Sequence, residues 1–294
     1  MSEPLPPTEG EDPRSAELDL LSTLALVELL VRDQRAAVEA VFAQSAPIAR
    51  AVDQIAARLA RGGRLHYVGA GSSGRIATLD AAEMPPTFGT SREMICAHIA
   101  GGAPALVAAV EGAEDDAAAG EAALQACVRR GDAVIGISAA GAAAFVVAAL
   151  ERGRAIGAYT IALTANADSP LARSAELAIV LPTGAEVLAG STRLKAGTAQ
   201  KIALNAISTA VMVRLGKVLG NLMVDLVANN RKLRARACRL VARLAEVDEP
   251  RAHELLELGD WSVKVAVVME RHGVGATQAR ALLQRHDGSL RSLM

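Results

Sequence analysis

Five short apolar segments separated by alanine-rich stretches constrain the fold of this chain more than any other feature. They are Leu65–Val68, Met94–Cys96, Ala133–Ile137, Thr160–Leu163 and Leu177–Leu181. Strand-length runs that alternate with helix-length runs predict a parallel sheet with helices on both faces. Near-continuous apolar strands are typical of sheets that are buried on both sides. The sequence therefore predicts an α/β fold of three layers, and ligands in such folds bind beyond the carboxyl ends of the strands.

A turn rich in glycine and serine follows the first predicted strand. It reads Gly69-Ala-Gly-Ser-Ser-Gly74. Gly71 and Gly74 let the backbone approach an anion, while Ser72 and Ser73 add hydroxyl donors beside the N–H groups of the next helix. Such a string also opens dinucleotide-binding folds, but the acidic residue that binds a ribose is missing, which favours a sugar phosphate. An ordinary strand-to-helix turn would have the same pattern.

Two glutamates follow unusual segments and are candidates for proton transfer. Glu83 ends the predicted helix after the turn, because Met84-Pro-Pro86 is expected to stop it. Glu114 follows a helical run and lies in the acidic segment Val110-Glu-Gly-Ala-Glu-Asp-Asp116. Two carboxylates in different environments can divide acid and base roles. The alternative interpretation is that Glu83 is a solvated residue at a helix end and that Glu114 belongs to a solvated acidic loop.

A polar segment before the next long helix offers further anion ligands. Ser191, Thr192 and Lys195 lie in it, and the whole chain has only five lysines. They could complete a site for an anionic sugar. Helix capping by Ser191 or Thr192, with solvated lysines, is the other interpretation.

Composition excludes several classes of protein. The net charge is −1 and 51% of the residues are hydrophobic, which indicates a globular chain without a surface for nucleic acid. No signal peptide or membrane-spanning run is present, so we expect a cytoplasmic protein. Three widely spaced cysteines and five histidines show neither a disulfide framework nor the spacing of metal ligands. We therefore predict no metal site, and we expect Trp261 to pack in the C-terminal part.

The pattern predicts three parts of the chain. Residues 1–45 form an N-terminal arm and helix, of which the first 14 or so are poorly ordered and Ser15 begins the helix. Residues 46–245 form the sugar-phosphate domain and end in long helices. Residues 246–294 form a small helical bundle.

Taken together, these segments closely resemble the N-acetylmuramic acid 6-phosphate etherases, a family with a sugar isomerase (SIS) domain that is related to the glucokinase regulator. The resemblance begins near Thr8 and reaches the C-terminus. Its most specific parts are Gly69–Gly89, Val110–Asp116, Gly190–Lys201 and Gly216–Asp225. It implies an SIS-type three-layer core, a C-terminal bundle like a ubiquitin-associated domain, and a homodimer whose sites lie between protomers. It further implies that Glu83 and Glu114 are the acid–base pair, and that no metal or organic cofactor is used.

The loop after the third strand departs from the family pattern. The family has Ser-x-Ser-Gly-Arg-Thr-Pro-Tyr there, whereas this chain has Ser138-Ala-Ala-Gly-Ala-Ala-Ala-Phe145. Ser138 is kept as a phosphate ligand, but three hydroxyls and an arginine are replaced. Each lost donor to an anion would cost about 1.5–3 kcal/mol.

The implied reaction is the removal of D-lactate from N-acetylmuramic acid 6-phosphate during the recycling of cell-wall sugars. Glu83 is assigned as the acid that protonates the departing ether oxygen, and Glu114 as the base that takes the C2 proton. Two alternatives remain open: a sugar-phosphate-sensing regulatory protein with weakened catalysis, and a phosphosugar isomerase.

Overall fold

The structure is a computed structural model and describes residues 6–294. The chain divides into two compact units. The first comprises the residues up to Ala81 and Glu93–Ser208, and the second comprises Ala82–Arg92 and Thr209–Met294. Each unit has its own core. The three predicted parts, 1–45, 46–245 and 246–294, stay a prediction.

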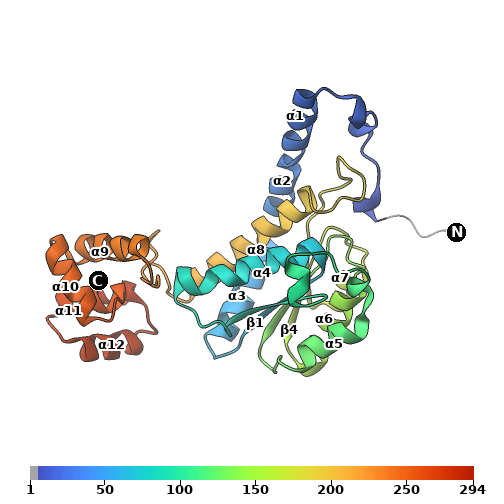
Figure 1. Cartoon of the computed structure of the whole chain (residues 1–294). Helices are drawn as coiled ribbons and strands as arrows, with labels where there is room; N and C mark the ends of the chain where they lie inside the picture. The colour runs from blue at the N-terminus through green and yellow to red at the C-terminus, as the bar shows by residue number, and fades with distance from the viewer. Residues whose placement is uncertain (1–5) are drawn as a thin grey trace. The chain divides into compact units, whose positions relative to one another are not determined.

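A five-stranded parallel sheet forms the centre of the first unit (Figure 1). Its order is β2-β1-β3-β4-β5, and every pairing is parallel. The strands are β1 (Leu65–Gly69), β2 (Ile95–Ile99), β3 (Ala133–Ile137), β4 (Tyr159–Thr164) and β5 (Leu177–Val180). All five predicted strands are therefore confirmed to within a few residues. The full burial of β1 and β3 explains why their sequences are apolar on both faces.

Helices cover both faces of this sheet, as predicted (Figure 1). Because successive side chains of a strand point to opposite faces, Val68 and Tyr67 of β1 face different helices. Val68 packs in a cluster with residues of α5 (Ala117–Gln125), α6 (Ala144–Ile156) and α7 (Pro170–Ser174). On the other face, the Tyr67 hydroxyl reaches Asp80 of α4 (Gly71–Phe88), and Asp80 in turn contacts α8 (Lys195–Arg214).

The N-terminal segment differs from its prediction. Residues 6–22 form three 3₁₀ turns, Pro7–Glu9, Pro13–Ser15 and Leu18–Leu20, so the expectation of a poorly ordered arm is wrong for residues 6–14. Residues 1–5 lie outside the described part. The first α-helix begins after Ser22 rather than at Ser15, because the Ser22 hydroxyl accepts the N–H of Ala25. The helices that follow are α1 (Thr23–Asp33), α2 (Arg35–Ala43) and α3 (Ser45–Leu59).

Helix α4 also corrects the sequence prediction. It runs through Pro85 and Pro86 to Phe88 instead of stopping at Glu83. Each proline lacks the N–H that would bond the carbonyl group four residues earlier, so the carbonyl groups of Ala81 and Ala82 lose their usual donors within the helix. The N–H of Gly89 then bonds to the Pro85 carbonyl at 3.0 Å and closes the last turn.

The second unit contains four complete α-helices with one apolar core. They are α9 (Arg231–Ala245), α10 (Glu249–Leu258), α11 (Val263–His272) and α12 (Ala276–Arg285). Leu255, Val267 and Leu283 are among the buried residues of this core, and Trp261 packs against it as predicted. The buried Lys264 ammonium is held by Asp225 and by two carbonyl oxygens. Among residues 6–294, none of the helices combines the length and the apolar character that crossing a membrane requires.

Candidate functional site

The predicted phosphate ligands follow two strands that lie side by side. β1 pairs with β2 on one side and with β3 on the other, so the strand order reverses between β1 and β3. Ligands of open α/β sheets bind at such a reversal, beyond the carboxyl ends of the strands. Gly71–Gly74 follow β1 and Ser138 follows β3. The fold therefore places both predicted phosphate segments at the edge where this class of protein binds ligands.

The glycines of the first turn are required by its geometry. Gly71 has φ of +53°, a left-handed conformation that suits glycine. At Gly74, a Cβ atom would lie 2.5 Å from the Ile99 side chain, so the turn can approach β2 closely only without a side chain. Ser73 is buried and its hydroxyl donates to Gln200 of α8 at 2.9 Å, whereas Ser72 is half-buried. Of the two serines, Ser72 is thus the more accessible to a ligand.

A buried aspartate that sequence reasoning missed holds this helix in place. Asp80 is 3% exposed and accepts hydrogen bonds from Tyr67, Asn205 and Ser208 at 2.9, 2.6 and 3.0 Å. The three donors come from β1 and α8, so Asp80 ties α4 to its neighbours on both sides. Burial, together with the Asp80 carboxylate, raises the pKa of Tyr67 well above its usual value. In the sequence, Asp80 could have been recognised as a buried polar residue because it lies one turn before Glu83 on an otherwise apolar helix face.

The loop after β3 keeps a hydroxyl turn despite its alanines. The Ser138 hydroxyl accepts the N–H of Gly141 at 3.1 Å, and the Ser138 N–H donates to the Leu163 carbonyl. Helix α6 follows, and its cap residue Ala143 supplies no side-chain acceptor. The sequence change therefore removes side chains from this loop, while its backbone still leads into the start of a helix.

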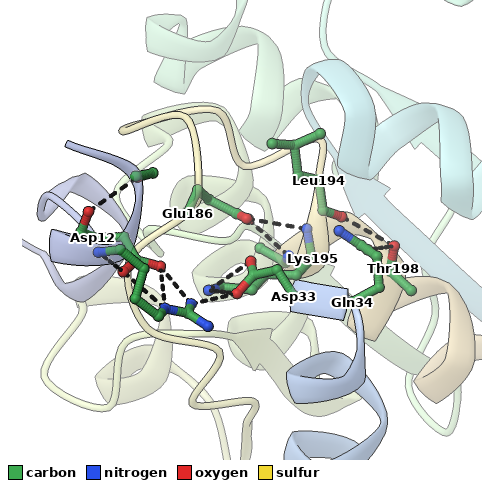
Figure 2. A network of polar contacts seen from close by, with 10 residues as sticks. Asp12, Asp33, Gln34, Glu186, Leu194, Lys195 and Thr198 are labelled. Atoms are coloured by element: carbon green, nitrogen blue, oxygen red, sulfur yellow. Dashed lines mark hydrogen bonds and ion pairs between the residues drawn. The ribbon is translucent and has the colours of Figure 1, made fainter. Parts of the chain in front are cut away.

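Lys195 is held inside the protein by a carboxylate, in contrast to a solvated lysine (Figure 2). It is 3% exposed, and its ammonium lies 3.0 Å from Oδ2 of Asp33 and donates to Oδ1 at 3.2 Å. Asp33 is also paired with Arg14 at 2.6 Å. Glu186 accepts the N–H groups of Lys195 and Ala196 and so caps α8. Burial raises the pKa of Glu186.

Ser191 and Thr192 lie in the turn just before α8. Both are half-buried, and the Thr192 carbonyl accepts the N–H of Gly197 at 2.9 Å. The cap of α8 is Glu186 rather than either hydroxyl residue, so the capping interpretation does not account for them. Their role as sugar-phosphate ligands stays a prediction.

The two candidate acid–base residues are exposed. Glu83 lies on the last part of α4, and Glu114 lies in the 3₁₀ turn Ala113–Asp115. The loop that leads to Glu114 is fixed by Arg75, whose guanidinium donates to the carbonyl groups of Ala105 and Ala108 at 2.9 Å each. Sequence reasoning missed Arg75, which follows the Gly-Ser turn directly and connects α4 to this loop.

Comparison with known proteins identifies the family. An N-acetylmuramic acid 6-phosphate etherase of Parasynechococcus marenigrum (strain WH8102) is 49% identical over 285 residues, which cover 97% of this chain and 90% of that protein. The protein of the same name from Pectobacterium atrosepticum is 47% identical over 98% of this chain and 95% of its own length. The chain belongs to the N-acetylmuramic acid 6-phosphate etherase family. The resemblance seen in the sequence is thereby confirmed.

Two domain families match parts of this etherase-family chain. The glucokinase regulatory protein N-terminal SIS domain matches residues 47–154, and the SIS domain matches residues 109–210. Among solved structures, a phosphoheptose isomerase from Francisella tularensis has a TM-score of 0.50 at 18% identity, over 66% of this chain and 98% of that one. That likeness shows the fold alone, and it agrees with the predicted SIS core.

Proposed function

We propose that this protein cleaves the D-lactyl ether of N-acetylmuramic acid 6-phosphate, giving N-acetylglucosamine 6-phosphate and D-lactate. The observation that carries the proposal is the identity of 49% with a relative of this name over 97% of the chain. The Gly-Ser turn at the switch point of the sheet supports it, because a turn of this kind suits the phosphate of the substrate. The reaction places the protein in the recycling of amino sugars from peptidoglycan, in the cytoplasm.

The phosphate would be held mainly by the backbone and hydroxyl groups at the ends of β1 and β3. The N–H groups at the start of α4 and the hydroxyl of Ser72 form one side of this cradle. Ser138 and the first N–H groups of α6 form the other. Since Ala143 caps α6 without a side chain, backbone donors there take over part of what the missing hydroxyls would do. Ser191 and Thr192 are assigned to the sugar.

The chemistry we propose is elimination followed by addition of water. In the open-chain aldehyde, the C2 proton is acidic because it lies next to the carbonyl. Glu114 takes this proton, the C2–C3 double bond forms, and the C3–oxygen bond breaks as Glu83 protonates the leaving lactate oxygen. Water then adds at C3, and the C2 position regains a proton. Two carboxylates in different surroundings suffice for these transfers.

Isotope labelling tests which bonds break and form in this reaction. Turnover in ¹⁸O-water should place the label on C3 of the sugar, leave lactate unlabelled, and exchange the C2 proton with solvent. Glu83→Gln should lose lactate release while retaining C2 exchange, and Glu121→Gln, an exposed glutamate of α5, is the matched control. Label in lactate would exclude elimination, and full activity of Glu83→Gln would exclude Glu83 as the acid.

The same experiment separates the two alternatives. An isomerase would interconvert aldose and ketose without releasing lactate, and a regulatory protein would bind the sugar phosphate without turnover. The names of the relatives at 46–49% identity weigh against both.

We further propose that the protein is a homodimer with sites between protomers. Helices α1 and α2 expose a row of large apolar side chains that includes Leu24 at 70%, Val31 at 67% and Phe42 at 75%. Val107, in the loop before Glu114, is 91% exposed. Surfaces of this kind are typical of contact with another chain. A stable monomer with full activity in light scattering would exclude the dimer.

A further inference from the structure

The fold brings together two histidines and a cysteine that are far apart in the sequence. His66 lies on β1, His98 on β2, and Cys127 just after α5. Nδ1 of His66 is 3.1 Å from Nε2 of His98, and this Nε2 is 3.8 Å from Sγ of Cys127. All three atoms lie within 4.8 Å of one another. We propose that His66, His98 and Cys127 form a zinc site, separate from the sugar-phosphate site.

Two of the three separations, those that involve Nε2 of His98, fit a tetrahedral ion. Zinc takes nitrogen at about 2.0–2.1 Å and thiolate sulfur at about 2.3 Å, so the edges of its coordination tetrahedron are about 3.3 Å between nitrogens and 3.6 Å between nitrogen and sulfur. The observed separations of 3.1 and 3.8 Å are close to these edges. Small rotations of the His98 ring and the Cys127 thiol would direct both atoms at the ion. Imidazole and thiolate are also the ligand types that zinc prefers.

A buried carboxylate fixes the orientation of His66. Oδ2 of Asp132 is 3.3 Å from Nε2 of His66, and we assign the proton to Nε2, which leaves the Nδ1 lone pair facing His98 and Cys127. Asp132 is itself immobilised, since it accepts the backbone N–H groups of Arg64 and Arg129. A carboxylate on the remote nitrogen of a ligating histidine is the usual partner in zinc sites.

An ion at this cluster would need a neutral imidazole on each histidine and a thiolate on Cys127. Zinc binding would therefore displace the thiol proton to solvent, with no other bond broken.

A route from solvent leads to the cluster. His98 and Cys127 are half-buried, while His66 is fully buried. His98, together with Ala123 and Phe145, lines an open hollow of about 580 Å³ beside β2. A water that enters from this hollow would supply the fourth ligand. The site lies on the face of the sheet covered by α5 and α6, whereas the Tyr67–Asp80 contact that holds α4 lies on the opposite face.

Cobalt and zinc binding to the full chain test the proposal. Co²⁺ should give the intense visible bands of tetrahedral coordination and a thiolate-to-cobalt charge-transfer band. Zn²⁺ titration by calorimetry should show one site per chain and the release of about one proton per ion, read from buffers of different ionisation enthalpy. Cys127→Ser should abolish the charge-transfer band, and both Cys127→Ser and His98→Gln should weaken zinc binding about tenfold or more.

Two control variants test whether cobalt and zinc bind at cysteines or histidines outside the proposed site. Cys238→Ser, in the second unit, and His253→Gln, an exposed histidine, should leave the spectrum and the affinity unchanged. The cobalt spectrum of the unaltered protein is decisive even where a variant folds poorly. Cobalt binding without the thiolate band, or no saturable binding, would overturn the site. Zinc affinities of Cys127→Ser and His98→Gln equal to that of the unaltered protein would also overturn it.

Discussion

The buried pair between Lys195 and Asp33 offers a test that separates a structural lysine from a substrate ligand. Asp33 is the last residue of α1, where a carboxylate faces the negative end of the helix, and Lys195 is the first residue of α8, where an ammonium faces the positive end. Each charge therefore compensates for the unfavourable position of the other. Lys195→Met removes the ammonium and keeps most of the aliphatic side chain.

The expected loss of stability follows from what remains around Asp33. Removing one partner of a buried ion pair costs about 3–5 kcal/mol, because the other charge is left unpaired. Asp33 would retain Arg14 at 2.6 Å, although the Arg14 side chain is 58% exposed and holds only one carboxylate oxygen firmly. We therefore expect a loss near the lower end, about 3 kcal/mol, for Lys195→Met. Adding Asp33→Asn should recover about 2 kcal/mol, since neighbouring sites couple by about 0.5–3 kcal/mol.

Urea unfolding followed by far-ultraviolet circular dichroism measures this loss. Lys201→Met is the matched control, because Lys201 lies on the same helix, is exposed and donates its hydrogen bond to Asn205 rather than to a carboxylate. Its free energy of unfolding should change by no more than an ordinary surface substitution causes, about ±0.5 kcal/mol. Titration with N-acetylglucosamine 6-phosphate should be run on the same samples at temperatures where each variant is folded.

Two results would refute this reasoning. If Lys195→Met keeps its stability but loses sugar-phosphate affinity, Lys195 leaves Asp33 to bind the ligand, as the sequence alone had predicted. If the effects of Lys195→Met and Asp33→Asn simply add, the two side chains do not stabilise one another in solution.

Three further predictions concern other parts of the molecule. The raised pKa of Tyr67 means that its phenol ionises first in the unfolded chain, so stability should fall as the pH rises above 10, and Tyr67→Phe should flatten this decline in alkaline unfolding curves. Ala140→Ser with Ala143→Thr should tighten N-acetylglucosamine 6-phosphate binding about tenfold in calorimetry; unchanged or weaker affinity would mean that other groups already hold the phosphate. Phe42→Glu should shift light scattering from dimer to monomer, and an unchanged mass would place the dimer contact elsewhere.

The sheet could be predicted because its signal is local. Each strand is a short apolar run, and the boundaries of Ala133–Ile137 agree with the structure to the residue. The turn at Gly71 and Gly74 was predictable for a related reason: positive φ and close backbone approach demand glycine whatever the distant surroundings are. Patterns that depend on the residue itself or on its immediate neighbours can be recognised in one sequence.

Helix boundaries were less predictable, since several local signals compete. Ser15 and Ser22 are both suitable cap residues, and only the structure shows that Ser22 accepts the N–H of Ala25. Pro85 and Pro86 suggested a stop, yet each proline removes only one backbone donor, and the helix runs through both to Phe88. The N-terminal turns are held by Arg14, which reaches Asp33 across 19 positions.

The polar residues that shape the candidate site were beyond prediction because their partners are remote. Asp80 contacts Asn205 and Ser208 across 125 and 128 positions, and Lys195 contacts Asp33 across 162. A lysine beside serine and threonine resembles an anion site in the sequence, but a carboxylate far upstream occupies the ammonium. Only the packing of α1 against the start of α8 distinguishes the two roles.

Remote partners can also hide a site: the sequence suggested an anion site at Lys195, but it gave no sign of the proposed zinc site. His66 and His98 are 32 positions apart and Cys127 is 29 beyond His98, so no spacing rule for metal ligands applies to them. The register of the sheet pairs Val68 with His98 and Cys96 with His66, and it thereby turns both imidazoles to one face. The end of α5 brings the thiol to that face. A site assembled by strand register leaves no motif in the sequence, and it becomes recognisable only when the distances between ligand atoms are compared with the edges of a coordination tetrahedron.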